Sequence, residues 1–325
     1  MFFKFKPKPI SSIQSELKLE KWHSLGNDFL ISRTNVSQEK IKQLSDRNFG
    51  IGCDQFITLE NNTVRFFNND GSESEMCGNA LKCIGEIVSR ETASNGLTAQ
   101  SFLVKTTKQE MQIKMEDGFT SICMGKPLKF KEEGNPFAYL TFEERTKRRD
   151  VNYDFFKLLQ KKDNYFYFVD LGNPHLVCIL NLSEEDPLLQ RKIFDTFLSS
   201  ESVSDVINYL GEAIQREFLK TSGVNVSFVV VESETEVYVR TFERGVGETL
   251  SCGSGACASV FSVVKSVFVS RETKLSTNHE IKVFNKGSEK TEEISESFHI
   301  ISLDSSENIW LKGKGKKVGD VTVNN

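Results

Sequence analysis

The chain carries one short design twice, as Met76-Cys77-Gly78-Asn79-Ala80 and, 175 positions later, as Ser251-Cys252-Gly253-Ser254-Gly255. Each version follows an extended apolar run and an acidic loop, and each continues into small apolar residues that predict helices over 80–88 and 256–267. The same shift superposes the preceding residues without a gap: Val64 falls on Val239, Arg65 on Arg240, Phe67 on Phe242 and Glu73 on Glu248. We therefore predict an internal duplication in which each copy sets one thiol at the start of a helix.

The repeat is wider than the two cysteine motifs. In the same order, each half has a turn with an asparagine, a helix, a glycine-containing turn with an amide, and strands that lead to the Cys-Gly loop. The asparagine turns are Gly26-Asn27 and Gly172-Asn173, the helices are 37–47 and 203–219, and the amides are Gln55 and Asn225. We predict two α+β domains related by a pseudo-two-fold axis, with a ligand cleft between them.

Composition and charge narrow the classes of function. The chain of 325 residues is 38% hydrophobic and 26% charged with a net charge of −4, which is ordinary for a globular protein and gives no electrostatic reason for binding nucleic acid or an anionic membrane. No apolar run approaches the roughly 18 residues that span a bilayer, and the first nine residues lack an apolar core of signal-peptide length. Seven cysteines, an odd number, fit reduced thiols better than a disulfide framework. We expect a cytoplasmic protein with a short N-terminal extension, and we interpret the charged residues near 131–165 as a solvated face or surface insertion.

Two thiols at helix N-termini suit proton transfer at a carbon atom. The first N–H groups and the dipole of a helix favour the thiolate, and this is expected to bring the thiol pKa from about 8.5 towards neutrality. Racemisation needs a base on one face of a planar carbanion and an acid on the other. The glycine after each cysteine lets backbone N–H groups approach a carboxylate and stabilise the charge that develops on it. Cys77 and Cys252 are therefore the candidate catalytic pair.

Other interpretations of the cysteines stay open at this point. Cys77, Cys83, Cys252 and Cys257 would supply four zinc ligands, but their spacings exceed most zinc-knuckle patterns and both units run into helices. A disulfide between Cys77 and Cys252 would be an oxidised, inactive form. We interpret the remaining cysteines as packing residues, namely those at 53, 83, 123, 178 and 257.

The main break in the symmetry is Glu243-Arg244, which stands where the first copy has Asn68-Asn69. A duplicated scaffold supplies two similar proton-transfer groups, so asymmetric residues are candidates for substrate recognition. Arg244 can clamp a carboxylate with its planar fork, and Glu243 can hold an ammonium group; an ordinary surface salt bridge is the alternative. His175 lies in the second asparagine turn, where it is either a structural histidine or part of the site.

Taken together, these residues resemble the diaminopimelate epimerase family. The resemblance covers roughly residues 18–323, and the matching motifs are His23-Ser24-Leu25-Gly26-Asn27-Asp28-Phe29, Gly52-Cys53-Asp54-Gln55, Phe67-Asn68-Asn69-Asp70-Gly71-Ser72, Met76-Cys77-Gly78-Asn79, Gly172-Asn173-Pro174-His175 and Glu243-Arg244-Gly245-Val246-Gly247-Glu248-Thr249 through Cys257. Proline racemase-like proteins share the Cys-Gly pairs but not the Glu-Arg-Gly-x-Gly-Glu-Thr run. Ala80-Leu81-Lys82 departs from the Gly-Ala-Arg that is usual in the family.

The resemblance implies a particular α+β fold. Two pseudo-symmetric domains would arise from the duplication, each a mostly antiparallel β-sheet or barrel around a central helix. The implied boundaries are an N-terminal extension at 1–17, a first domain at 18–128 that the C-terminal strand at 313–325 completes, and a second domain at 129–312.

The resemblance also implies an activity, a cofactor-independent epimerase that interconverts LL-2,6-diaminopimelate and meso-diaminopimelate by a two-base thiol mechanism, in lysine and peptidoglycan precursor biosynthesis. Cys77 and Cys252 would be catalytic, with His175 supporting the reacting centre. The substrate-binding residues would be Asn27, Gln55, Asn68, Gly78, Asn79, Asn173, Asn225, Glu243, Arg244, Gly253 and Ser254. No metal or other cofactor is expected; the partner is a small-molecule substrate and neither nucleic acid nor a membrane, and a homodimer stays open. The competing hypotheses are a related amino-acid racemase with broader substrate choice and a silent binding protein, against which the presence of both Cys-Gly turns argues.

Overall fold

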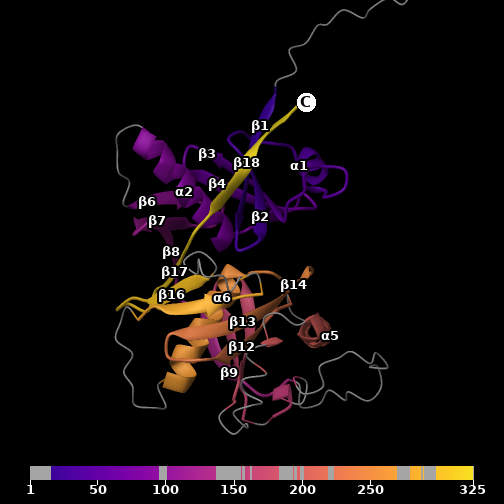
Figure 1. Cartoon of the computed structure of the whole chain (residues 1–325), viewed down its shortest axis with the longest axis vertical. Helices are drawn as coiled ribbons and strands as arrows, with labels where there is room; N and C mark the ends of the chain where they lie inside the picture. The colour runs from indigo at the N-terminus through magenta and orange to yellow at the C-terminus, as the bar shows by residue number, and fades with distance from the viewer. Residues whose placement is uncertain are drawn as a thin grey trace, which may run out of the picture.

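The computed structural model describes residues 16–94, 101–136, 155, 158–161, 163–182, 193, 196–197, 201–218, 223–268, 279–286, 288 and 298–324. Figure 1 shows two lobes, one above the other, with the C-terminus returning to the top beside the first strand. Most of the N-terminal extension and of the charged segment near 131–165 lies outside the described residues. Among the helices in these ranges, none combines the length and apolar character needed to cross a membrane.

The first half of the chain builds the upper lobe (Figure 1). Ser37 caps its first helix as predicted, since its side chain accepts the Lys40 N–H at 3.3 Å. The elements of this half are β1 (Leu17–Ser24), β2 (Asn27–Ser32), α1 (Gln38–Ser45), β3 (Gln55–Glu60), β4 (Thr63–Asn68), β5 (Glu73–Ser74), α2 (Gly78–Ser94), β6 (Ser101–Lys105), β7 (Glu110–Glu116), β8 (Phe119–Gly125) and β9 (Lys129–Glu133), of which β9 lies in the lower lobe.

The second half repeats this order in the lower lobe, where α5 takes the place of α1 and α6 the place of α2 (Figure 1). Its elements are β10 (Tyr165–Asp170), β11 (Pro174–Leu180), α5 (Glu201–Phe218), β12 (Asn225–Val231), β13 (Glu236–Glu243), β14 (Gly247–Thr249), α6 (Gly253–Val263), the short π-helix η1 (Val264–Phe268), β15 (Ile281–Phe284), β16 (His299–Leu303), β17 (Ile309–Gly313) and β18 (Lys316–Val323), of which β18 lies in the upper lobe.

The two halves share one pattern of strand pairing. β2 is parallel to β3 as β11 is to β12, and β4 is parallel to β6 as β13 is to β15. Phe67 lies opposite Glu73 in the first half, and Phe242 lies opposite Glu248 in the second. These are the partners that the shift of 175 positions brings together, so the structure confirms the predicted duplication and its α+β class.

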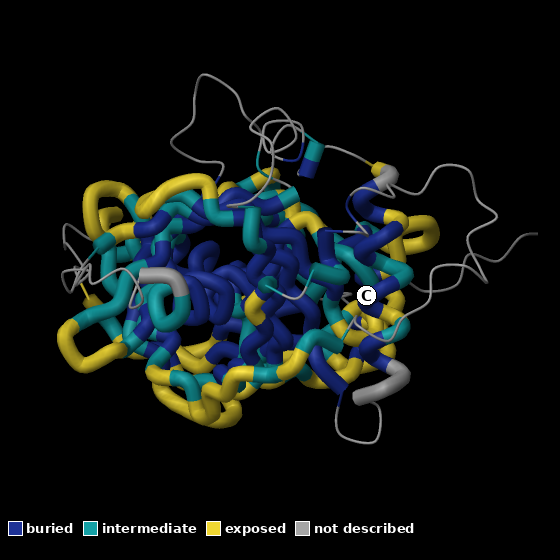
Figure 2. The backbone as a smooth tube through the Cα atoms, turned by 90° about the horizontal axis from the view of Figure 1, so that it is seen from below, coloured by how far each residue is buried: buried dark blue, intermediate teal, exposed yellow. Residues whose placement is uncertain are grey.

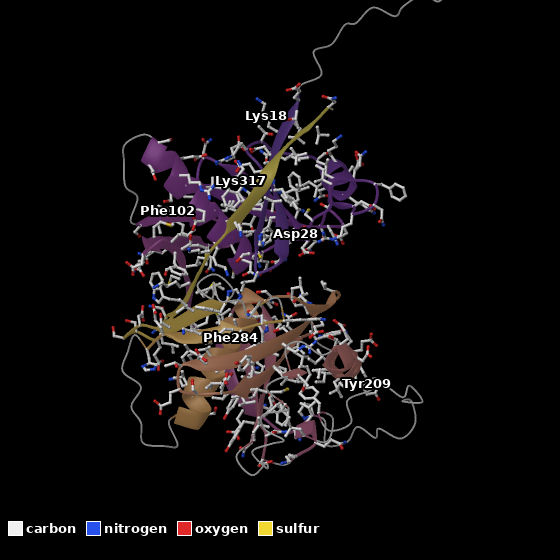
Figure 3. All side chains as sticks on the ribbon, in the orientation of Figure 1. Lys18, Asp28, Phe102, Tyr209, Phe284 and Lys317 are labelled. Atoms are coloured by element: carbon white, nitrogen blue, oxygen red, sulfur yellow. The ribbon has the colours of Figure 1, made fainter. Side chains whose placement is uncertain are left out.

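Each half gives its last strand to the other half. β9 pairs with β10, β18 pairs with β1, and β8 and β17 pair antiparallel at the join between the lobes. In Figure 3, Lys317 of β18 lies among the side chains of the upper lobe, where its Nζ is 3.2 Å from the Glu20 carboxylate of β1. The domain boundaries inferred above stay predictions, because strand pairing does not show which parts fold alone.

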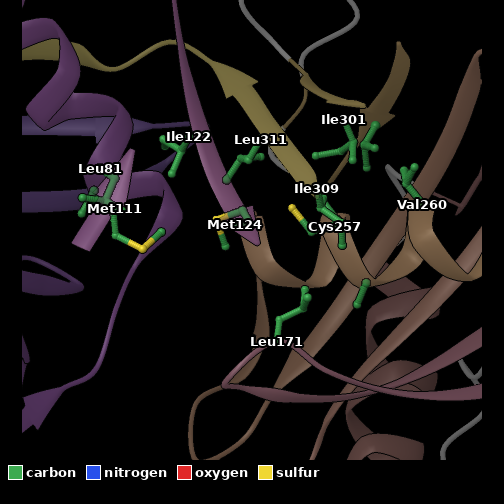
Figure 4. Close-up of a cluster of buried hydrophobic side chains, with 14 of the residues drawn as sticks. Leu81, Met111, Ile122, Met124, Leu171, Cys257, Val260, Ile301, Ile309 and Leu311 are labelled. Atoms are coloured by element: carbon green, nitrogen blue, oxygen red, sulfur yellow. The ribbon is translucent and has the colours of Figure 1, made fainter. Parts of the chain in front are cut away.

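One apolar core runs through the join. It contains side chains of both halves, among them Leu81 on α2, Ile122 on β8, Leu311 on β17 and Cys257 on α6 (Figure 4). Two further clusters lie beneath α1 and α5, and Figure 2 shows the buried segments in the middle of the molecule with exposed ones at its rim. The shared core fixes the position of α2 relative to α6.

The two central helices begin earlier than predicted. α2 starts at Gly78 where 80 was expected, and α6 starts at Gly253 where 256 was expected. α2 also continues to Ser94, beyond the predicted end at 88, because the polar residues there support the last turns. The Thr92 hydroxyl donates to the Val88 carbonyl at 2.9 Å, and the Ser94 hydroxyl donates to the Glu91 carbonyl at 2.8 Å. As a result, each thiol is followed at once by a helical turn.

Candidate active site

The first turns of α2 and α6 meet at the join between the halves. A Cβ atom added to Gly78 would lie 2.6 Å from Leu311 Cδ2, and one added to Gly253 would lie 3.0 Å from the same atom. The Cβ atom added to Gly253 would also lie 3.3 Å from Asn79 Oδ1. A side chain at either glycine would therefore separate the two helices or displace Leu311, and glycine permits the close approach.

Cys77 and Cys252 immediately precede these two helices. The Cys252 sulfur caps α6 by accepting the Gly255 N–H at 3.4 Å, and the Cys77 thiol donates to Asn27 Oδ1 at 3.9 Å. The charge of Glu243 influences both thiols, and that of Cys77 influences Cys252. All seven cysteines of the chain are free thiols, so both sulfurs are available for proton transfer.

Burial raises the pKa of both thiols. The pKa of Cys77 is raised to about 11, and the pKa of Cys252 lies well above its ordinary value, first because burial disfavours the charged thiolate. The charge of Glu243 adds to the increase, whereas the N–H groups of the helix turns oppose it. The prediction that helix N-termini bring these thiols towards neutrality is therefore wrong for this structure, since desolvation outweighs a few backbone hydrogen bonds.

Polar side chains of the first half gather beside Cys77. Asn79 Nδ2 donates to Asn27 Oδ1 at 3.3 Å, and Asn27 Nδ2 donates to the Asp54 carboxylate at 2.9 Å. Gln55 Nε2 donates to Asn68 Oδ1 at 3.3 Å, because the two residues are partners in the β3–β4 register. The structure thus places the predicted amides on the ends of β2, β3 and β4, and Asn27 among them contacts the start of α2.

A second set of polar side chains surrounds the start of α6. Ser254 Oγ lies 3.5 Å from the Cys252 sulfur and 3.0 Å from His175 Nε2. Asn173 Nδ2 donates to the same hydroxyl at 3.4 Å, and its Oδ1 accepts from Asn225 Nδ2 at 2.8 Å. Asn225 Oδ1 in turn accepts the main-chain N–H of Arg244 at 2.8 Å. The hydroxyl of Ser254 therefore occupies the place in this half that the Asn79 amide has in the other.

Glu243 is the acidic group beside the second thiol. Thr249 Oγ1 donates to Glu243 Oε1 at 2.5 Å across the β13–β14 hairpin, and the neighbouring Cys252 thiol also lowers the pKa of this carboxyl group. Burial raises the pKa of Glu243, against the opposite effect of Thr249 and Cys252, and the charge of Asp54 adds to the increase. Since Asp54 belongs to the first half, the pKa of Glu243 depends on groups from both halves.

Three buried polar atoms of this region have no hydrogen-bond partner among the described residues. They are Gln55 Oε1, Asn79 Oδ1 and His175 Nδ1. Burial lowers the pKa of His175 to about 3, so its ring is neutral at physiological pH and one nitrogen accepts while the other donates. Buried polar atoms are normally paired, and three exceptions in residues that the sequence already marks are consistent with a binding site for a polar ligand.

The other cysteines lie away from this chemistry. Cys53, Cys83, Cys178 and Cys257 are buried, as predicted for packing residues, whereas Cys123 is only partly buried, because β8 turns that residue outward. Within the described part of the chain, no group of three or more His, Cys, Asp or Glu side chains is arranged to hold a metal ion.

Several residues of the site region are not among the predicted ones. Asp54 and Thr249 are part of motifs quoted above, so their sequence neighbours give a local signal. Ser251 and His299 also contact this region, with His299 Nε2 2.9 Å from Ser251 Oγ. His299 lies on β16, far along the chain from either motif, and nothing in its sequence surroundings indicates this position.

The two-lobed, pseudo-symmetric fold defines a class of proteins. A solved structure of that class is a phenazine biosynthesis protein of the PhzF family from Bacillus anthracis, with a TM-score of 0.60 and 14% identity over 95% of this chain and 99% of that one. At this identity the likeness shows the fold alone.

The chain belongs to the diaminopimelate epimerase family. The family model described as diaminopimelate epimerase matches residues 21–130 and 167–297. The diaminopimelate epimerase of Paraburkholderia xenovorans is 31% identical over 81% of this chain and 88% of its own length, and that of Paraburkholderia phytofirmans is 31% identical over 77% and 80%. The resemblance seen in the sequence is confirmed, and the chain is an enzyme of the epimerase class.

Proposed function

We propose that the enzyme interconverts LL-2,6-diaminopimelate and meso-diaminopimelate, without a cofactor, by proton transfer through Cys77 and Cys252. The observation that carries the proposal is the pair of thiols at the starts of α2 and α6, which meet at the join between two repeated halves. Inversion at a carbon atom requires a proton-transfer group on each face. The substrate is inferred from the related diaminopimelate epimerases.

The reaction is a proton exchange across one carbon atom. One thiolate removes the α-hydrogen as a proton and becomes a thiol, while the electron pair of the broken C–H bond stays on the carbon and spreads into its carboxylate. The opposite thiol gives its proton to the other face and is left as a thiolate. Each turnover therefore inverts the centre and exchanges the protonation of the two sulfurs, so the reverse reaction can start from that state.

Burial disfavours formation of the first thiolate, because it raises the pKa of both thiols. The carboxylate of Glu243 is close enough to the Cys252 thiol for each to shift the pKa of the other, so it is suited to receive that proton. Burial also raises the pKa of Glu243, which makes its carboxylate a stronger base than that of an exposed glutamate. The Gly255 N–H then stabilises the sulfur anion.

The helix N-termini also suit the carboxylate of the reacting centre. The first N–H groups of a helix have no partner within it, and in this protein they belong to Gly78, Asn79, Gly253 and Ser254. Negative charge that passes from the α-carbon into the carboxylate would be stabilised by both turns. Asn79 Oδ1, buried and unpaired among the described residues, is suited to accept from the α-ammonium group.

The proposal is tested by incubating the full chain with LL-diaminopimelate and separating the stereoisomers over time. We expect the meso isomer to form, at a rate that dialysis against a chelator and added pyridoxal phosphate leave unchanged. Equally fast racemisation of short amino acids would contradict the substrate, and loss of activity in chelator with recovery in zinc would contradict cofactor independence.

Because both sulfurs must stay reduced, we also place the activity in a reducing compartment such as the cytoplasm.

Arg244→Lys is expected to lower kcat/KM for diaminopimelate by about one to two decades, the effect of losing about 1.5–3 kcal/mol from a charge-assisted hydrogen bond. The substrate carries a second amino-acid end that does not react, and the main-chain bond to Asn225 fixes residue 244 next to the amides of the second half. A guanidinium reads a carboxylate with two parallel hydrogen bonds, which lysine cannot reproduce.

Steady-state kinetics with the full substrate measure this change. Thiol alkylation and the melting temperature serve as controls, and both are expected to stay near wild type. An unchanged kcat/KM would leave Arg244 as a surface residue and assign distal recognition to Asn68, Asn173 and Asn225.

A further inference from the structure

Lys82 is a fully buried lysine at the join between the halves, and the proton transfer described above does not use it. It lies on α2, one turn after Gly78, with no exposed surface. A Cβ atom added to Gly313 of β17 would lie 2.9 Å from Lys82 Cδ, so the side chain passes closely over this glycine. Its Nζ ends 2.8 Å from Nδ1 of His299 on β16, which places a cationic donor of the first half against an imidazole of the second.

The contact continues to both cysteine turns. His299 Nε2 lies 2.9 Å from the Oγ of Ser251, the residue before Cys252. Asn79 Nδ2 reaches the carbonyl of Ser251 at 3.3 Å, and the same Nδ2 reaches Asn27 Oδ1 at 3.3 Å. Asn27 Oδ1 accepts from the Cys77 thiol at 3.9 Å. A chain of polar contacts thus joins Lys82 to Ser251, which precedes Cys252, and through Asn79 to the Cys77 thiol.

Burial of the charged form of this lysine lowers the free energy of unfolding of the protein. It lowers the pKa of Lys82 to about 7, although Cys83, Cys77 and Cys257 act in the opposite direction, and the pKa of His299 lies well below its ordinary value. In the unfolded chain the lysine stays charged up to its ordinary pKa of 10.5. The loss of stability is therefore complete below about pH 7, where the folded protein also holds the charged form, and it decreases as the pH rises above 7. A residue that only served stability would not be a lysine at this position.

We propose that Lys82 is a positioning residue for the reaction, which acts through His299 and Ser251 to orient the Asn79 amide and the turn that carries Cys252. The inference rests on the proposed function, since the oriented groups are those that hold the reacting centre. If Lys82 donates to His299 Nδ1, the proton of the neutral imidazole is on Nε2 and points at Ser251 Oγ. The hydroxyl is then fixed as an acceptor, which suits the Asn79 amide beside it.

Lys82→Met tests the inference, because methionine keeps the length and apolar stem and removes the donor. We expect kcat for diaminopimelate epimerisation to fall by about tenfold, the order of effect of one lost buried hydrogen bond, with KM little changed. The melting temperature at pH 7 is expected to stay or rise, since the buried amine is gone. Lys82→Arg keeps a cationic donor towards His299 and is expected to recover most of the rate.

Thr120→Val is the matched control. The Thr120 hydroxyl donates to the Lys82 main-chain carbonyl at 3.3 Å and is equally buried, so its loss disturbs α2 without touching the side-chain contacts. We expect this variant to lose stability and to keep kcat. A wild-type kcat in Lys82→Met, or a loss of kcat in Thr120→Val as large as that in Lys82→Met, would overturn the inference. Because wild-type turnover is measured in the same assay, inactive wild type would refute the proposed function instead.

Discussion

Replacing either Cys77 or Cys252 by alanine is expected to abolish epimerisation while leaving the fold intact. Positioned general acids and bases contribute about 10²–10⁴ each, and inversion fails if either face lacks its group. Each cysteine immediately precedes a central helix. Alanine removes only the sulfur, so the main chain that forms the first helical turn is kept. The rate of meso-isomer formation measures the effect, and circular dichroism measures the fold.

Cys83→Ala is the control for these two variants. Cys83 is a buried thiol of the same helix, whose sulfur donates to main-chain carbonyls of His23 and Asn79, each at 3.6 Å. Cys83→Ala removes the same atom as Cys77→Ala, but the Cys83 sulfur contacts main-chain carbonyls and packs beside Gly315, so we expect turnover close to that of wild type. Substantial epimerisation in Cys77→Ala or in Cys252→Ala would refute the two-thiol mechanism.

Glu248→Ala is expected to lower the free energy of unfolding by about 3–5 kcal/mol, the usual cost of removing one partner of a buried ion pair. Arg240 and Glu248 are 0% and 2% exposed, and the pair is bidentate, with Nε–Oε1 at 2.5 Å and Nη2–Oε2 at 2.8 Å. Lys286 Nζ is 3.2 Å from the same carboxylate. Without Glu248, two cations would face each other next to the core beneath α5.

The duplication provides a matched control at the position equivalent to Glu248. Arg65 and Glu73 form the same bidentate pair, at 2.9 and 2.8 Å, but are 39% and 31% exposed. An exposed pair contributes about 0–1 kcal/mol, so Glu73→Ala is expected to have a small effect in the same urea titration. Equal losses in the two variants would show that burial does not decide the strength of this repeated contact.

The sequence predicts this repeated contact because both partners of each pair lie within one cysteine motif. Arg65 and Glu73, like their counterparts 175 positions later, are joined by a short hairpin, and such local geometry follows from local residues. The placement of a thiol at the start of each central helix is predictable for the same reason. The family and the two-lobed fold could also be predicted from the sequence, since the matching motifs are numerous and spread along the chain.

Other features depend on packing between distant segments. The high thiol pKa of Cys77 arises from burial at the join, which no residue near Cys77 indicates. Lys82 is visible in the sequence only as a departure from the usual arginine, and its partner His299 lies 217 residues away. The exchange of β9 and β18 between the halves likewise depends on pairing across the whole chain.

Deuterium incorporation in D2O tests the central claim most directly, namely that two thiols act on opposite faces of one carbon atom. LL-diaminopimelate is incubated with the wild-type enzyme, and both stereoisomers are analysed by mass spectrometry at early conversion. Since the proton delivered to the product comes from a thiol that exchanges with solvent, we predict that each meso molecule carries one deuterium at the inverted carbon, while the remaining LL substrate keeps its hydrogen. Meso product that retains the original α-hydrogen would contradict the account, because it would show one group carrying the same proton from one face to the other.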